Sequence, residues 1–258
     1  METVNAVLVG IFGLAWGSFL NVVIHRLPRD MSLLKPPSSC PGCGKRIRPW
    51  DNIPVLSYIF LGGRCRACRK KISPVYPFVE LLTASGLVLV FLRGGGVFSL
   101  DFFAAALFTS AMIVLGVIDY FHQILPDVIT LPGFALALIY AALRDDLTFK
   151  QALIGAVVGA GFLLFVYGAY FLLRRKEGLG MGDVTMMLLV GAFLGWKSTL
   201  LTLILASFSG ALVGAAVIKF GRKNLQFALP FGTFLAPAAF VAMVWGDAII
   251  TAYLSLYP

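Results

Sequence analysis

The chain has 258 residues, of which 59% are hydrophobic and 13% are charged, and its mean hydropathy is +0.91. This composition excludes a soluble globular protein and predicts an integral membrane protein. The net charge of +9 does not indicate a nucleic-acid partner. In a membrane protein, Lys and Arg gather in the loops on the cytoplasmic side, so an excess of them reflects the orientation of the chain.

Eight apolar segments follow one another along the chain, and each is a candidate membrane-spanning helix. They are 4–24, 77–93, 100–118, 127–143, 150–173, 183–195, 199–219 and 229–254. Runs this apolar form helices in lipid, because a helix satisfies its own backbone and a bilayer takes about 20 residues to cross. We predict an all-α polytopic membrane protein with about eight transmembrane helices and a small cytoplasmic zinc-binding loop domain. Only Gly195-Trp196-Lys197 separates the sixth segment from the seventh.

The distribution of Lys and Arg predicts which loops face the cytoplasm. If the chain enters from outside, the inside loops and the flanking Lys219 hold 17 of the 21 Lys and Arg residues, and the other side holds 4. These inside loops are 25–76, 119–126, 174–182 and 220–228. Such an excess marks the cytoplasmic side, so we expect both termini outside.

Three parts follow from this topology. The first segment has no basic region before it and no small-residue cleavage pattern after it, so we expect residues 1–24 to remain as a transmembrane helix. Residues 25–76 form a cytoplasmic loop domain, and residues 77–258 form a multi-helix transmembrane domain.

The loop contains four cysteines in two CxxC pairs, Cys40 with Cys43 and Cys65 with Cys68, separated by 21 residues. Two such pairs form knuckles whose thiolates converge on a closed tetrahedral site, which is typical of structural zinc. Two disulfides are the alternative, and a cytoplasmic location argues against them because thiols are kept reduced there.

Two acids lie at the ends of apolar segments on the predicted cytoplasmic side. Asp119 follows the third segment, and Asp183 opens the sixth after Gly180 and Gly182. A carboxylate at such a depth is costly and indicates a function, although Asp183 also suits a helix N-cap. The glycines permit a sharp turn and close approach of a substrate. Asp127 is expected as a cap or as support for the pair.

Several stretches in order resemble the motifs of bacterial type IV prepilin peptidases, which are membrane aspartic proteases of the GxGD type. These stretches are GSFLNVVIHRLP at 17–28, CPGC at 40–43, DNIPVLSY at 51–58, CRAC at 65–68, ISPVYPFVE at 72–80, IDYFHQILPD at 118–127 and GMGD at 180–183. The resemblance runs from about residue 10 to 240.

The resemblance implies an enzyme of the bacterial inner membrane that serves type IV pilus assembly or type II secretion. It implies cleavage of the short basic leader of membrane-inserted prepilins or pseudopilins after a Gly, with Asp119 and Asp183 as catalytic residues. It also implies N-methylation of the new first residue, usually Phe, with S-adenosylmethionine as methyl donor, because the cysteine loop is characteristic of the branch that does both.

The methyl donor or the substrate is expected between the loop and the ends of the first two spans. Glu80, His25, Arg26 and Asn21 are the candidate residues there, with Glu80 orienting His25 or Arg26 or contacting the methyl donor. Other roles remain open: an interfacial acid for Glu80, an interhelical hydrogen bond for Asn21, and the headgroup region for His25 and Arg26.

Two carboxylates in contact share one proton, so one activates water and the other protonates the leaving amine. Asp183 lies at the N-terminus of its predicted helix, where the helix dipole favours the charged carboxylate. Asp119 lies at a helix C-terminus, where the dipole does not, and this difference predicts Asp183 as the base. The alternatives are a peptidase without methyl transfer, a proton-coupled transporter and a zinc-bearing scaffold. A transporter would have an inverted repeat, which the halves of this sequence lack.

Overall fold

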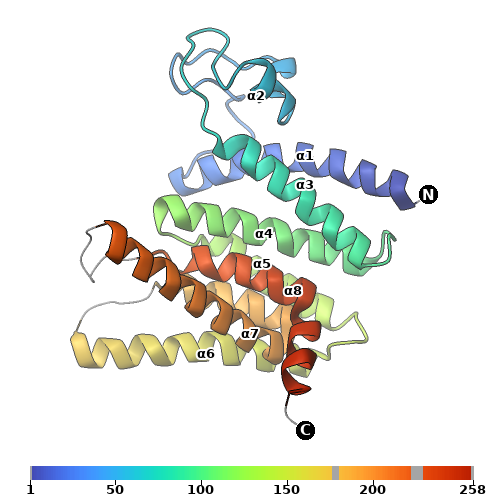
Figure 1. Cartoon of the computed structure of the whole chain (residues 1–258), viewed down its shortest axis with the longest axis vertical. Helices are drawn as coiled ribbons and strands as arrows, with labels where there is room; N and C mark the ends of the chain where they lie inside the picture. Colours follow the sequence, from blue (N-terminus) through green and yellow to red (C-terminus); the bar gives the residue numbers. More distant parts are fainter. Residues whose placement is uncertain (1, 176–179, 222–228, 257–258) are drawn as a thin grey trace. The chain divides into compact units, whose positions relative to one another are not determined.

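Apart from two isolated β-bridges, helices make up the regular structure of the described residues, which are 2–175, 180–221 and 229–256 of this computed structural model (Figure 1). In chain order they are α1 (Glu2–Arg26), the 3-10 helices η1 (Leu27–Arg29) and η2 (Pro49–Asn52), α2 (Leu56–Phe60), α3 (Val75–Arg93), α4 (Leu100–His122), α5 (Asp127–Ala141), α6 (Phe149–Arg174), α7 (Met181–Gly221) and α8 (Gly232–Leu254). The all-α prediction is confirmed. Parts of the predicted loops 174–182 and 220–228 lie outside the described residues.

The predicted apolar segments all fall on helices. By length and composition, six helices of the described chain can cross a membrane: α1, α3, α4, α6, α7 and α8. Helix α5 is also apolar but has 15 residues, fewer than the roughly 20 that a bilayer takes. The sixth and seventh segments share the 41-residue α7, where Gly195 is non-helical with φ 73° and ψ 169°.

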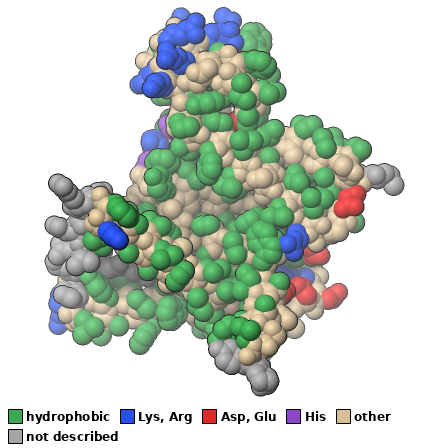
Figure 2. All heavy atoms as spheres, viewed as in Figure 1, with side chains coloured by type: hydrophobic (Ala, Val, Ile, Leu, Met, Phe, Trp, Pro, Cys, Tyr) green, Lys and Arg blue, Asp and Glu red, His purple; other side chains and the backbone are tan. Residues whose placement is uncertain are grey.

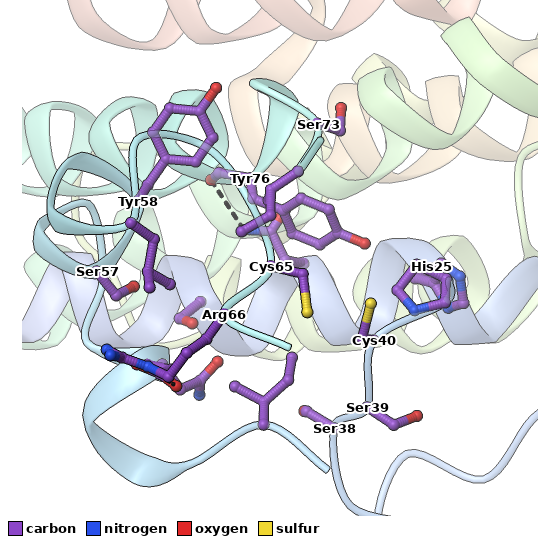
Figure 3. Close-up of a pocket in the computed structure, with 18 of the residues that line it drawn as sticks. His25, Ser38, Ser39, Cys40, Ser57, Tyr58, Cys65, Arg66, Ser73 and Tyr76 are labelled. Carbon is purple, nitrogen blue, oxygen red and sulfur yellow. Dashed lines mark hydrogen bonds and ion pairs between the residues drawn. The ribbon is translucent and has the colours of Figure 1, made fainter. Parts of the chain in front are cut away.

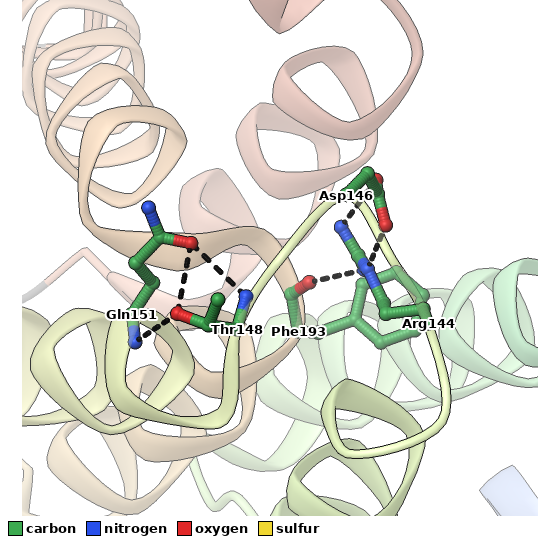
Figure 4. A network of polar contacts seen from close by, with 5 residues as sticks. All are labelled: Arg144, Asp146, Thr148, Gln151 and Phe193. Carbon is green, nitrogen blue, oxygen red and sulfur yellow. Dashed lines mark hydrogen bonds and ion pairs between the residues drawn. The ribbon is translucent and has the colours of Figure 1, made fainter.

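A polar network stands beside this break in α7 (Figure 4). Arg144, which follows α5, donates to the carbonyl of Phe193 at 3.2 Å, two residues before Gly195. The same guanidinium donates to Asp146 at 2.6 and 2.8 Å and lies 5.0 Å above the ring of Tyr140. Arg144 thus supplies a donor to backbone at the kink, as a broken helix requires.

Helices α6 and α7 approach each other through glycines. A Cβ on Gly155 of α6 would overlap the backbone of Gly191 in α7, and a Cβ on Gly191 would overlap that of Gly155. Small residues allow two membrane helices to pack backbone against backbone, where van der Waals contact replaces the hydrophobic driving force. This contact fixes α7, which carries one of the two acids.

The chain divides into two compact units, Met1–Val114 and Leu115–Pro258, and the division falls within α4. In the first unit, α1 and α3 pack closely because Gly13 and Gly17 face the backbones of Ala84 and Glu80. The second unit contains the end of α4 and helices α5 to α8. The division into 1–24, 25–76 and 77–258 stays a prediction from the sequence.

Candidate active site

Asp119 lies in the last turn of α4, in the second unit, and is 5% exposed. Its Oδ2 accepts hydrogen bonds from the backbone N–H of Thr233 at 2.6 Å and from the Thr233 hydroxyl at 3.0 Å. Thr233 is the second residue of α8. The carboxylate therefore meets a helix N-terminus, where free N–H groups and the helix dipole stabilise negative charge.

Asp183 lies in the first turn of α7 and is 7% exposed. Its Oδ2 accepts from the backbone N–H of Gly180 at 3.2 Å, so this third residue of α7 reaches back to the residue before the helix. Asp183 is not itself the N-cap, and the simple N-cap alternative is wrong. The backbone N–H of Gly232 is a second donor, and the Asp119 carboxylate is close enough to interact electrostatically. The structure thus brings together the two acids that the sequence singled out.

The start of α8 connects the two carboxylates. The N–H of Gly232 donates to Asp183, and the N–H of the next residue, Thr233, donates to Asp119. Sequence reasoning missed both residues. A signal was available, because the last span begins after a predicted inside loop and therefore on the same side as the two acids.

The expected asymmetry between the two acids is wrong. Asp119 ends α4, as predicted, but its carboxylate rests on the N-terminus of α8, just as that of Asp183 rests on the N-terminus of α7. Both charged forms gain helix N-terminal donors, so the helix dipole does not single out Asp183 as the base.

The glycines of this region make room for Leu125, which lies between α4 and α5. A Cβ on Gly182 would lie 2.8 Å from the Cβ of Leu125, and a Cβ on Gly232 would lie 2.9 Å from its Cδ1. Leu125 therefore packs against both segments that hold Asp183. At Gly180 the nearest atom to an added Cβ is Asp183 Oδ2 at 3.3 Å, so this position is less crowded. Gly182 is needed for packing within the chain.

Asp127 is not the N-cap of α5, since Pro126 occupies that position. Its Oδ1 accepts a hydrogen bond from the hydroxyl of Thr185 at 3.0 Å, and that hydroxyl also lies 3.1 Å from the carbonyl oxygen of Gly182. The cap expectation is wrong, and Asp127 instead links α5 to the first turn of α7, close to Asp183.

The two cysteine pairs, in the first unit, fold in the same way. In each pair the N–H of the first cysteine, Cys40 or Cys65, donates to the carbonyl five residues later at 2.9 Å. The residue after the second cysteine has a positive φ, 69° at Gly44 and 58° at Arg69, and its N–H donates back to the first cysteine. Two isolated β-bridges close these turns. The loop is thus a repeated knuckle.

The four thiols fit a tetrahedral metal ion. Their sulfur atoms lie within 4.8 Å of one another, and the Sγ atoms of Cys40 and Cys68 are 3.7 Å apart. Zinc bound to four thiolates at about 2.3 Å would hold its sulfurs about 3.8 Å apart. All four cysteines are free thiols, so the disulfide alternative is not the arrangement of this structure.

The electrostatics of the thiols also suit a cation. Backbone N–H groups of Cys68 and Ala67 lower the pKa of the Cys65 thiol to about 6. Despite a backbone hydrogen bond from Lys70, burial and the neighbouring cysteines raise the pKa of Cys68 to about 11. One thiolate forms readily, whereas its negative charge disfavours ionisation of the neighbouring thiols. A bound divalent cation would offset this repulsion.

The first unit also contains a cavity of about 630 Å³ between the loop and the ends of α1 and α3 (Figure 3). The four residues expected near a methyl donor all line it: Asn21, His25, Arg26 and Glu80. Tyr58 and Tyr76 line it as well, and the thiols of Cys40 and Cys65 point toward each other at its edge. The cavity size is in the range of small-molecule sites.

Glu80 and Arg26 have other hydrogen-bond partners than the sequence suggested. Glu80, 7% exposed, accepts hydrogen bonds from the N–H of Val55 at 2.7 Å and from Ser18, so these and not His25 or Arg26 are its partners. Arg26, 8% exposed, is buried and donates to the carbonyls of Ser32 at 2.8 Å and Pro36 at 2.6 Å, which anchors the loop.

Asn21 makes the interhelical hydrogen bond that was one of its two expected roles. Its Nδ2 donates to the carbonyl of Tyr76 at 3.0 Å, which joins α1 to the start of α3. Across the loop, Arg66 pairs with Asp51 at 2.6 Å, and this hydrogen bond holds the pKa of the Asp51 carboxyl below its usual value. The cavity is therefore walled by fixed polar groups.

Two family models match the chain. One, described as "Bacterial Peptidase A24 N-terminal domain", matches residues 11–94, and one described as "Type IV leader peptidase family" matches residues 106–215. The Prepilin leader peptidase/N-methyltransferase of Pseudomonas putida is 39% identical over 96% of this chain and 93% of that protein. The protein of the same name from Pseudomonas aeruginosa is 38% identical over 95% of this chain and 91% of its own length. That from Aeromonas hydrophila is 38% identical over 96% of this chain and 93% of its own length. No solved structure matches.

Proposed function

This chain belongs to the type IV leader peptidase family, and from that premise we propose that it removes the leader peptides of membrane-inserted prepilins or pseudopilins and N-methylates the new N-terminus. The observation that carries the peptidase proposal is the buried carboxylate pair of Asp119 and Asp183, held by adjacent N–H groups of α8.

The chemistry follows from the pair. Two neighbouring carboxylates that interact electrostatically ionise together only at a cost, so we expect the pair to hold one proton. The ionised member takes a proton from water, whose oxygen adds to the scissile carbonyl carbon. The protonated member donates a hydrogen bond to that carbonyl and then gives its proton to the leaving amine as the C–N bond breaks. The N–H groups of Gly232 and Thr233 keep both carboxylates oriented through these steps.

The test uses the full chain in lipid vesicles with a full-length prepilin, comparing wild type with Asp119→Asn and Asp183→Asn. Each variant should lose leader cleavage. Asp146→Asn, which removes an exposed acid of the α5–α6 loop, is the matched control and should cleave normally. Native-rate cleavage by either of the first two variants would refute the two-aspartate mechanism. Proton-coupled transport or a scaffold role would then be the favoured function.

For the methyl donor we propose the cavity of the first unit. S-adenosylmethionine carries an adenine, a sulfonium cation and an amino-acid end, and it supplies the methyl group that the amine of the new N-terminus takes. Tyrosine rings suit the adenine and the cation. The carboxylate of Glu80 and the side chains of His25 and Asn21 offer polar partners to the rest.

Methyl transfer should be measured on pilin whose leader has already been removed, with radiolabelled S-adenosylmethionine. Tyr58→Ala and His25→Ala should lower methyl transfer while cleavage of prepilin persists. Asp119→Asn should show the reverse pattern. If Tyr58→Ala and His25→Ala methylate at the wild-type rate, the cavity is not the methyl-donor site.

Two further assignments belong to this proposal. We assign the four cysteines to a structural zinc ion, because the donor set is closed and leaves no open position for a substrate. We place the aspartates and the loop at the cytoplasmic face and both termini outside, on the 17-to-4 distribution of Lys and Arg that follows when all eight apolar segments cross, the short α5 and both halves of α7 included.

A further inference from the structure

Helix α2, within the cysteine loop, presents an unusually apolar surface to its surroundings. Leu56, Ile59 and Phe60 are 52%, 64% and 84% exposed, and Ile53 just before them is 46% exposed. Figure 2 shows Lys and Arg gathered on one part of the loop and hydrophobic side chains on another. An apolar patch of this kind on an otherwise basic loop marks a contact surface.

The depth of α2 indicates what this surface contacts. The N–H of Val55, the residue before α2, donates to Glu80 Oε2 at 2.7 Å. Glu80 is the sixth residue of the candidate span α3, about 7.5 Å along its axis from Val75 at 1.5 Å per residue. Its other partner, Ser18, lies eight residues before the end of α1. Helix α2 therefore begins beside the interior of two membrane spans.

The neighbouring surface of α3 is of the same kind. Phe78, Leu81 and Leu82 are 59%, 51% and 39% exposed and lie on the first two turns of a helix that crosses the bilayer. Side chains like these face lipid in a membrane protein, and α2 lies at the same depth along α3.

The backbone around α2 is self-satisfied, as backbone in lipid has to be. Val55 has φ 59° and ψ −51°, and the N–H of Leu56 donates to the carbonyl of Pro54 at 2.5 Å, which makes a tight γ-turn. The N–H groups of Ser57, Ile59 and residues 61–63 donate to carbonyls within residues 53–59. Glu80 supplies the acceptor for Val55 that the turn itself does not offer.

We propose that α2 is an interfacial membrane helix, with Ile53, Leu56, Ile59 and Phe60 inserted among the lipid acyl chains beside α3 and the basic knuckles at the headgroups. The 11 Lys and Arg residues of the loop favour an anionic surface. The opposite side of this segment, Ser57, Tyr58 and Leu61, lines the 630 Å³ cavity. The segment 53–61 thus separates the cavity from the lipid.

The test places the photo-crosslinking residue p-benzoylphenylalanine at Phe60 in the full chain, reconstituted in vesicles of phosphatidylethanolamine and phosphatidylglycerol. Two matched positions calibrate it: Phe78 on the exposed face of α3, and Lys71 on the second knuckle, which is exposed and pairs with Arg64 in a β-bridge. An unchanged helical circular-dichroism spectrum and a single peak in size-exclusion chromatography show that each variant is folded.

Irradiation should give lipid adducts at position 60 as often as at position 78, and several-fold more often than at position 71. Lipid adducts at position 60 that are as rare as at position 71 would overturn the proposal. Adducts at position 60 to a second copy of this chain would overturn it too, because they would show a protein partner on α2. The result does not depend on the proposed enzymatic activities, since neither is the readout.

Discussion

The two polar centres of this chain are built in opposite ways. Each cysteine knuckle is formed by a short contiguous stretch, is mostly exposed, and repeats the same turn twice within one loop. The aspartate pair joins the end of α4, the start of α7 and the start of α8, and both acids are buried. A local motif can carry the first kind of site in any well-solvated loop. The second kind exists only if three helices are packed correctly.

This difference predicts what each centre will tolerate. If the knuckles hold the proposed zinc ion, which would neutralise their crowded thiols, they should be sensitive to metal and insensitive to helix packing. The aspartate pair depends on close contacts at Leu125 and on the first N–H groups of α8. It should be sensitive to a single added methyl group and insensitive to metal.

The largest expected effect is on cleavage when one carboxylate is removed. Asp119→Asn and Asp183→Asn should each lower the rate of leader cleavage by about 10³-fold or more, as loss of an acid–base group in a catalytic unit does. Both should leave zinc content unchanged, because the knuckles lie in the other unit. Cleavage is followed by gel shift of the prepilin and zinc by elemental analysis. A loss of zinc in either variant would break the separation of the two centres.

The reciprocal change removes the metal. Cys40→Ser with Cys68→Ser should abolish bound zinc and lower methyl transfer to processed pilin strongly, because the loop that walls the cavity loses its cross-link. Cleavage should fall much less. The control is Ser85→Ala, which alters an exposed serine of α3 outside the cavity and no thiol. Equal losses of cleavage and methyl transfer would show that the loop also serves the aspartate centre.

How far the sequence predicted each centre follows from the same contrast. The CxxC spacing was enough to predict the cysteine cluster, because the interacting residues are near neighbours in sequence. Asp119 and Asp183 stood out because charge is rare in spans. Gly232 and Thr233 did not, because a helix N-terminus becomes a ligand only through the packing of α8 against α4. The apolar segments were evident, since lipid permits little besides helices.

Glu80 shows a second limit. Its place within a span was evident, but its burial was not, since an interfacial acid remained open. Its partner is the N–H of Val55, a β-branched residue with a positive φ. Such residues disfavour that conformation, so no local preference of the sequence indicates the turn. The tertiary contact determines the local geometry there. The same holds for Arg26, whose acceptors are loop carbonyls that the sequence does not distinguish.

A smaller effect separates the two glycines before Asp183. Gly182→Ala would place a Cβ 2.8 Å from that of Leu125 and should lower cleavage by about 10- to 100-fold, since overpacking costs about 1–3 kcal/mol. Gly180→Ala meets only Asp183 Oδ2 at 3.3 Å and should cost less. Both are measured as kcat/KM on prepilin. Equal effects would mean that the pair is sensitive to backbone freedom and not to contact with Leu125.

The smallest predicted effect tests the hydrogen bond that sequence reasoning missed. Thr233→Val removes the hydroxyl that donates to Asp119 Oδ2 at 3.0 Å but keeps the shape and the backbone N–H at 2.6 Å. A hydrogen bond to a charged group contributes about 1.5–3 kcal/mol, and with the N–H retained we expect the lower end, about a tenfold fall in kcat with KM unchanged. Thr233→Ser keeps the donor and should restore most of the rate. Thr202→Val, which is more deeply buried and bonded to Ser198 within α7, should have no effect on kcat. If Thr233→Ser is as slow as Thr233→Val, the methyl group and not the hydroxyl matters, and α8 acts on the pair by packing alone.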